Sequence, residues 1–187
     1  MNENRVKTDL SNYPVGAWAS NVSILKRTLW FFANSIFIQS SFFPMMGFKI
    51  WLLRKFGAKI GEGVFIKPSV NIKYPWNLEI GDHTWIGEKV WIDNLGKVRI
   101  GSNVCISQDS MLMCGNHNYK KAEFDLMVGD ITIEDGVWVG AKCLVCPGVR
   151  LKSHAVLSVG SVASTDLEEY SIYRGNPAVK VKDRIIV

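Results

Sequence analysis

The sequence has few of the residues that mark several common protein classes. It contains four cysteines and three histidines in 187 residues. The four cysteines do not form the dense pattern of a small, disulfide-linked secreted domain. Residues 1–12 are polar and charged, so they do not resemble a secretory signal. We therefore expect a protein with reduced thiols in the cytoplasm.

Basic residues are not concentrated anywhere. The net charge is +5, but the lysines and arginines are scattered along the chain. The sequence has no block rich in lysine and arginine and no recognisable nucleic-acid module. This balance suits anionic or phosphorylated ligands and argues against a nucleic-acid partner.

Charge is absent from residues 28–48. This run is long enough to span a bilayer, but its Asn, Gln, Ser, Pro and Gly residues disfavour a lipid-exposed span. We expect two short apolar helices, interrupted near residues 41–44 and packed against the main body. The alternative is peripheral contact of residues 28–53 with the inner face of the cytoplasmic membrane. Flanking basic residues would suit an anionic lipid surface: Lys26, Arg27, Arg54 and Lys55.

The most regular feature is a repeat of six residues within a period of twenty. Aliphatic residues, all but the last of them larger than alanine, occupy its first position: Ile60, Ile80, Ile86, Ile92, Ile100, Ile106, Leu112, and then Ile133, Val139, Val145, Leu151, Leu157 and Ala163. Because side chains alternate along a strand, six residues make one short strand and a corner. Three such sides close a triangular coil, and residues 60–163 contain five coils. Glycine at the second position, as in Gly81, is expected to ease the corner backbone.

The repeat is interrupted on one side of the coils. The third side is lengthened at residues 74–79 and 94–99, and a long insertion follows Leu112 and ends before Ile133. All three excursions leave from the same corner. Insertions that gather on one face usually mark the binding face.

The sixth position of the repeat should point outward, yet it is often apolar. Examples are Phe65, Trp85, Trp91 and Trp138. Such a surface is expected to be covered by self-association. A prism with a three-fold axis would cover it, so we expect a homotrimer.

The pattern resembles that of the hexapeptide-repeat acyltransferases over residues 55–182. Four segments resemble the colanic-acid biosynthesis type of O-acetyltransferase, which acts in bacterial exopolysaccharide biosynthesis: 71–77 (NIKYPWN), 91–95 (WIDNL), 115–119 (GNHNY) and 175–178 (GNPA). The resemblance implies an all-β fold, a left-handed parallel β-helix. Residues 1–54 would form an N-terminal arm with apolar helices, 55–168 the β-helix with a catalytic loop at 113–132, and 169–187 a short C-terminal tail.

The resemblance also implies an activity. The enzyme would transfer acetyl from acetyl-CoA to a sugar hydroxyl, on a nucleotide sugar or a lipid-linked glycan. His117 matches the position of the family's catalytic histidine, and an imidazole suits removal of the hydroxyl proton at neutral pH. Asp93 and Asn94 lie on the same corner one coil below, where they would bind the acceptor or simply cap the corner. Asn116 and Tyr119 are further acceptor-binding candidates in the loop.

Acetyl-CoA would lie in a groove between neighbouring subunits. Backbone groups at Gly140, Ala141, Val159 and Gly160 would face the pantetheine arm, with Trp138 as a wall. The turn at Asn176 and Pro177 would lie near the adenine. Lys180 would meet the ribose phosphate as a point charge, or belong to a solvated tail.

Three other functions are compatible with parts of the sequence. An acetyltransferase for a small acceptor, such as serine or an antibiotic, would share the same histidine and cofactor site. A zinc lyase resembling γ-type carbonic anhydrase needs three histidines close together, and here they are far apart. A structural or interaction role would need no CoA site.

The cysteines do not indicate a metal site. Cys143 and Cys146 have no second ligand pair, so we expect no metal. Cys114 and His117 could form a Cys–His pair with Cys114 as the nucleophile, but the resemblance implies direct transfer of the acetyl group from acetyl-CoA to the acceptor.

Overall fold

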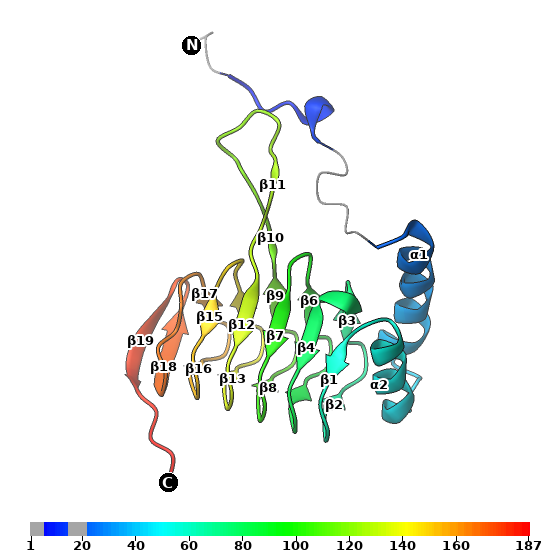
Figure 1. The fold of residues 1–187 in the computed structure, drawn as a ribbon. Coiled ribbons are helices and arrows are strands. Elements are labelled where there is room, and N and C mark those ends of the chain that lie inside the picture. Colours follow the sequence, from blue (N-terminus) through cyan, green and yellow to red (C-terminus); the bar gives the residue numbers. More distant parts are fainter. Residues whose placement is uncertain (1–5, 15–21) are drawn as a thin grey trace.

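The computed structural model describes residues 6–14 and 22–187. They form a three-sided β-solenoid of about six turns, with two helices at its N-terminal end and a hairpin that projects from one corner (Figure 1). The strands are short and run parallel from one turn to the next. This arrangement confirms the β-helical fold expected from the six-residue repeat.

Each side of the solenoid is one sheet, and all neighbouring strands are parallel except the last pair of sheet B, β18 and β19. Sheet A contains β1 (Lys59–Ile60), β4 (Leu78–Ile80), β7 (Val98–Ile100), β12 (Ile131–Ile133) and β15 (Arg150–Leu151). Sheet B contains β2 (Phe65–Ile66), β5 (Trp85–Ile86), β8 (Cys105–Ile106), β13 (Trp138–Val139), β16 (Val156–Leu157), β18 (Ser171–Gly175) and β19 (Ala178–Asp183). Sheet C contains β3 (Asn71–Ile72), β6 (Trp91–Asp93), β9 (Met111–Met113), β14 (Leu144–Val145) and β17 (Val162–Ala163).

The interior is a set of stacked aliphatic residues. On sheet A, Ile60 pairs with Ile80, Ile80 with Ile100, and Ile100 with Ile133. All four are buried. The first position of the repeat therefore supplies the core, and burial of these side chains is the main favourable contribution to folding.

The corners differ from expectation in one respect. Glycine at the second position does not adopt positive φ; instead, a Cβ on Gly81 would lie 2.7 Å from the carbonyl carbon of Gly101 in the next turn. Glycine is needed there because adjacent coils approach too closely for a side chain, not because the backbone requires a positive φ. The positive φ occurs two residues later, as at His83 (55°) and Lys142 (57°).

The C-terminal residues continue the solenoid. β18 pairs in parallel with β16, and β19 folds back antiparallel on β18. This sixth turn is why the structure exceeds the five expected coils. The division of the chain at 54 and 168 stays a prediction, and the solenoid crosses residue 168.

The N-terminal helices pack on the first turn of the solenoid, as expected. α1 (Ile24–Ala33) continues into a π-helical turn, η2 (Asn34–Ile38), and α2 (Met46–Lys55) follows a short loop. Trp30 is buried, and its indole N–H donates to the carbonyl oxygen of Ile72 at 2.9 Å. Within residues 6–14 and 22–187, no helix has the length and apolar character needed to cross a bilayer.

Candidate active site

The insertion after Leu112 forms an antiparallel hairpin. Its strands, β10 (Gly115–His117) and β11 (Leu126–Val128), pair with His117 opposite Leu126. The hairpin leaves sheet C directly after β9 and rises above the solenoid (Figure 1). His117 therefore stands at the base of the largest excursion, on a short strand.

The orientation of the His117 ring is fixed by Phe124. The two rings are stacked, with centroids 4.5 Å apart and planes 8° apart. Nδ1 of His117 lies 2.9 Å from the carbonyl oxygen of Phe124. Because a carbonyl oxygen can only accept, this hydrogen bond assigns the proton to Nδ1. In the neutral imidazole with this proton on Nδ1, Nε2 carries the free lone pair that a general base requires.

His117 lines a cavity of about 420 Å³ between the hairpin and sheet C. The other lining residues come from several elements: Tyr13, Lys73, Asp93, Leu95, Met113, Gly115 and Leu126. The ring of Tyr13 lies 5.9 Å from that of His117. Tyr13 directly follows a single 3₁₀ turn, η1 (Leu10–Asn12), which is held on the hairpin because the backbone N–H of Asp9 donates to the carbonyl of Ala122 at 2.8 Å.

Asp93 and Lys73 form the charged part of this cavity. β3 and β6 pair in register, so Lys73 lies one rung from Asp93. Lys73 Nζ is 2.8 Å from Asp93 Oδ1, and the Asp93 side chain is only 12% exposed. Oδ1 is itself buried, and apart from this ion pair it has no hydrogen-bond partner among the described residues. Because a carboxylate can accept several hydrogen bonds, Asp93 can accept a further donor besides Lys73.

The other acceptor-binding candidates do not line the cavity. Asn94 is fully buried, and its side chain bonds to the backbone N–H and carbonyl of Tyr74 at 2.9 and 2.5 Å. Asn116 Oδ1 accepts from the backbone N–H of His117 at 2.8 Å, and the backbone N–H of Tyr119 donates to the carbonyl of His117 at 3.0 Å. The side chain of Asn94 therefore serves the fold, whereas Asn116 and Tyr119 are exposed and lie outside the lining of this cavity.

The residues expected to bind the cofactor lie along one edge of sheet B. Gly140 and Ala141 follow β13, while Val159 and Gly160 follow β16, the neighbouring strand. Gly160 N–H donates to the carbonyl of Ala141 at 2.9 Å. Trp138 is about half exposed on β13, and its indole N–H donates to Ser107 Oγ at 3.0 Å. This edge and the hairpin are at different corners of the prism, with sheet C between them.

Three further cofactor candidates lie beyond that edge. Asn176 and Pro177 form the exposed turn between β18 and β19. Lys180, on β19, pairs with Glu168 at 3.0 Å and Asp183 at 2.9 Å. Hydrogen bonds to Asp183 and Glu168 raise the pKa of Lys180 to about 12. A phosphate would have to compete with these carboxylates for the ammonium group.

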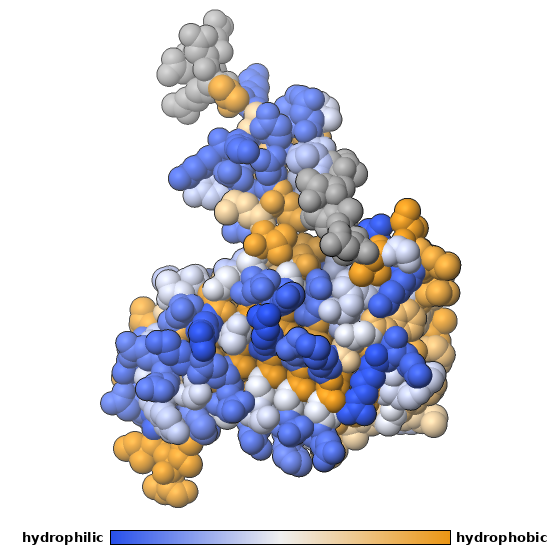
Figure 2. All heavy atoms as spheres, in the orientation of Figure 1, coloured by the Kyte–Doolittle hydropathy of each residue, from blue (hydrophilic) through white to orange (hydrophobic). Residues whose placement is uncertain are grey.

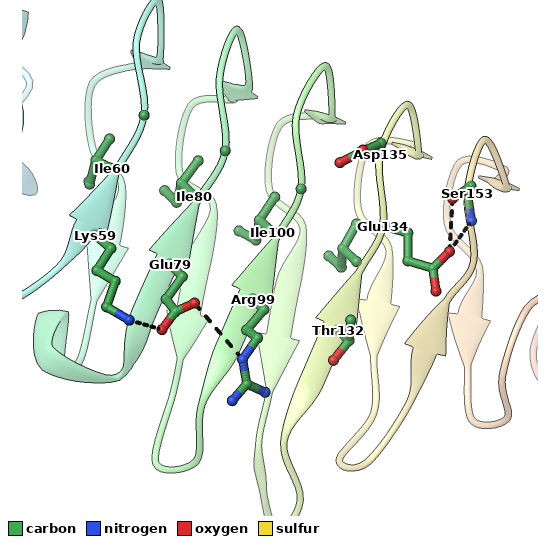
Figure 3. Close-up of a pocket in the computed structure, with 14 residues that line it drawn as sticks. Lys59, Ile60, Glu79, Ile80, Arg99, Ile100, Thr132, Glu134, Asp135 and Ser153 are labelled. Carbon is green, nitrogen blue, oxygen red and sulfur yellow. Dashed lines mark hydrogen bonds and ion pairs between the residues drawn. The ribbon is translucent and has the colours of Figure 1, made fainter.

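A larger hollow, about 700 Å³, runs along sheet A (Figure 3). Its charged side chains largely satisfy one another: Lys59 pairs with Glu79 at 2.8 Å, and Glu134 accepts from Ser153. It contains no histidine and none of the expected site residues. The smaller cavity at His117 is therefore the better candidate for catalysis.

The cysteines show no sign of catalytic activation. Cys114 is fully buried. Burial raises the pKa of Cys114 to about 11, so the group is a thiol rather than a nucleophilic thiolate at neutral pH. Burial also raises the pKa values of Cys143 and Cys146. Within the described part of the chain, no three His, Cys, Asp or Glu side chains are grouped so as to hold a metal ion.

Sequence reasoning missed three residues of this site. Lys73 could have been found, because it precedes Asp93 by one 20-residue period. Phe124 and Tyr13 had no such signal. Phe124 acts through its backbone carbonyl and its stacked ring, and Tyr13 reaches His117 only through the fold of the N-terminal arm.

Comparison with known proteins assigns this architecture to a family. The chain is 34% identical over 177 residues to the colanic acid biosynthesis acetyltransferase WcaF of Escherichia coli K12, covering 95% of this chain and 97% of that protein. It belongs to the hexapeptide-repeat acetyltransferases. No protein-family model matches the chain.

Other members of this family are more distant. The galactoside O-acetyltransferase of E. coli K12 is 25% identical over 135 residues, covering 71% of this chain and 66% of that protein. The fold matches that of the Vibrio cholerae hexapeptide-repeat acetyltransferase VCA0836 solved with acetyl coenzyme A. That match has a TM-score of 0.79 and 22% identity, and it covers 87% of this chain and 88% of the other. The chain is thus an acetyltransferase of the hexapeptide-repeat family.

Proposed function

We propose that this enzyme transfers acetyl from acetyl-CoA to a sugar hydroxyl in bacterial exopolysaccharide biosynthesis, with His117 as the general base. Similarity to the colanic acid enzyme along nearly the whole chain supports the reaction class. The observation that carries the assignment of the base is the Phe124 carbonyl, which holds the proton on Nδ1 and leaves Nε2 free.

The chemistry follows from this tautomer. Nε2 removes the proton of the acceptor hydroxyl as its oxygen attacks the thioester carbonyl. The tetrahedral intermediate collapses and its carbon–sulfur bond breaks. The leaving CoA thiolate then accepts from the imidazolium the proton that came from the acceptor hydroxyl. The developing oxyanion needs a donor. Ala141 has no hydroxyl to offer, so a backbone N–H supplies it.

The acceptor sugar lies in the cavity that contains His117. Asp93 accepts a hydrogen bond from a second sugar hydroxyl, because it lines this cavity and its side chain is 12% exposed. Lys73 lies on the preceding turn of the solenoid and holds that carboxylate through an ion pair. Tyr13 closes the cavity on the hairpin side. Asn94 and Asn116 contribute by positioning the chain that carries these groups, and the exposed Tyr119 stays a candidate contact for the acceptor.

Acetyl-CoA reaches His117 only if a second subunit is present. The proposed cofactor residues, including Gly140 and Gly160, lie at one corner of the prism, and the hairpin lies at another. We propose a homotrimer in which one corner of each chain meets the hairpin corner of the next. The exposed apolar ladder on sheet B, with Phe65 paired to Trp85, supports this because it needs a covering partner. Light scattering should give three times the chain mass of 21.0 kDa; a monomer would remove the shared site.

We place this reaction in the cytoplasm. All four cysteines are free thiols, and a reducing compartment preserves them.

The test is release of free CoA from acetyl-CoA with a panel of acceptors. The panel contains nucleotide sugars, lipid-linked oligosaccharides, simple glycosides, serine and chloramphenicol. We expect release to depend on a sugar acceptor. Release that depends on serine or chloramphenicol alone would instead assign the enzyme to small acceptors and contradict the proposal.

A further inference from the structure

The first helical segment is apolar on both sides. Trp30, Phe37 and Ile38 face the solenoid and are buried or partly buried. Four other apolar side chains follow one another at helical spacing and are more than half exposed: Leu25 (69%), Leu29 (53%), Phe32 (57%) and Ile36 (57%). We call these four residues the α1 outer stripe. Figure 2 shows the resulting apolar surface along the edge of the molecule that α1 forms in Figure 1.

The loop that follows extends this surface. Phe42 is 96% exposed and Met45 is 60% exposed. On α2, Trp51 is half exposed and lies under the ammonium group of Lys55, at 5.9 Å from Nζ to the ring centroid. So large an apolar area at one end of a molecule is unusual for a surface that faces water.

The sequence around the stripe carries charges of a single sign. The sequence has no Asp or Glu from Leu10 to Gly61, while the same stretch contains six basic residues: Lys26, Arg27, Lys49, Arg54, Lys55 and Lys59. Lys49 is buried and points at the carbonyl of Ile38, so it serves the fold. The other five are at least partly exposed. Lys59 pairs with Glu79, and Arg54 donates to the carbonyls of Ile60 and Gly61, which leaves Lys26, Arg27 and Lys55 for an anionic partner.

We propose that this end of the molecule docks on an anionic lipid bilayer, with the α1 outer stripe and Phe42 inserted at the headgroup level. A helix with apolar side chains toward the lipid and basic residues beside it lies in the plane of the interface. Each nearby Lys or Arg adds attraction to acidic headgroups. The helix is too short to span, so contact is peripheral.

A second copy of the chain is the competing occupant. A symmetric contact through this surface would bring like charges from each copy together without any acidic residue from the same stretch to offset them. An anionic bilayer instead complements that charge. The docking proposal stands apart from the proposed reaction, because it needs neither acetyl-CoA nor an acceptor.

The test is co-sedimentation of the full chain with phosphatidylcholine vesicles, with and without about one third phosphatidylglycerol. We expect binding to the anionic vesicles, weaker binding to the neutral ones, and weakening as salt rises. The double variant Leu29→Gln/Phe32→Gln should bind at least about tenfold less tightly. The matched control is Val179→Gln/Val181→Gln, which removes two exposed valines from β19 and should bind like the wild type.

Three results would overturn the proposal. The first is that the wild-type protein stays in the supernatant with anionic vesicles. The second is that the double variant binds these vesicles as tightly as the wild type. The third is that the double variant, measured by light scattering without lipid, forms smaller oligomers than the wild type. The last would show that the stripe is a contact between copies. Should the double variant fail to fold, Phe42→Gln replaces it, since Phe42 is almost fully exposed; it should weaken binding severalfold, and unchanged binding would also overturn docking.

Discussion

The imidazole of His117 and the backbone carbonyl of Phe124 are joined by a 2.9 Å contact, and the two rings stack face to face. One residue thus fixes both the tautomer and the plane of the base. The hydrogen bond comes from the backbone, so it survives substitution of the Phe124 side chain, whereas the stack does not.

Phe124→Ala separates these two contributions. The carbonyl remains, but the ring that holds the imidazole plane is lost. A stacked aromatic pair contributes about 0.5–1.5 kcal/mol, so kcat should fall by roughly two- to tenfold. The measurement is kcat at saturating acetyl-CoA and acceptor, with the KM for acetyl-CoA as internal control. An unchanged kcat would show that the stack does not orient the base.

Cys114 provides a test of the direct-transfer mechanism. Burial raises the pKa of this thiol to about 11, and thiols react as thiolates. Cys114 should therefore resist alkylation by iodoacetamide at pH 8 in the folded protein, as judged by peptide mass spectrometry. Cys114→Ala should keep kcat within about threefold, since the thiol has no role in the chemistry. A folded but inactive variant would point to a covalent acetyl-cysteine route.

Gly81 and Gly47 make a matched pair for the corner geometry. A methyl group on Gly81 would meet the next coil's backbone at 2.7 Å, while one on Gly47, in α2, meets nothing within 4 Å. Gly81→Ala should therefore lower the free energy of unfolding by about 2 kcal/mol or more. Gly47→Ala should raise it by about 0.5 kcal/mol, because alanine favours helix. Denaturant titration measures both, and equal effects would contradict the close-stacking explanation.

We expect Glu134 to contribute to the free energy of unfolding at neutral pH and to lose this contribution in acid. Burial alone would raise the pKa of Glu134, but hydrogen bonds from Ser153 and from Arg150 outweigh it and lower that pKa below 4.5. A lowered folded-state pKa gives stability that is complete above the unfolded value and is lost as pH falls through the folded value. Glu134→Gln should thus be less stable than wild type at pH 7, by about 1 kcal/mol. The difference in unfolding free energy between the two proteins should disappear as the pH falls below 4.5. A difference that stays constant with pH would contradict the conclusion that these hydrogen bonds lower the pKa of Glu134.

Much of the scaffold could be predicted because the repeat is strict. Every sixth residue had to be buried, and Ile80, Ile100 and Ile133 are. The position of the hairpin followed from the long break after Leu112. The sixth turn could not be predicted, because residues 171–175 lack the repeat and join the solenoid through backbone pairing with β16.

The site was less predictable than the scaffold. His117 could be selected by its chemistry and by resemblance, since the loop that carries it was visible in the sequence. Asn94 appeared equally suited to bind a sugar, but its amide is used to hold Tyr74. Tyr13 lies more than a hundred positions from His117 in the sequence, and only the course of the N-terminal arm brings the two rings together. Contacts of this kind depend on tertiary packing and have no local pattern.

The most direct test of the account is kcat for His117→Gln, compared with wild type at saturating acetyl-CoA and a sugar acceptor that the wild type acetylates. Binding of CoA to both proteins is measured in parallel by calorimetry. Loss of a general base should lower kcat by about 10²–10⁴-fold, while CoA binding stays within a few fold. A folded His117→Gln variant that turns over at the wild-type rate would contradict the central claim that His117 is the base.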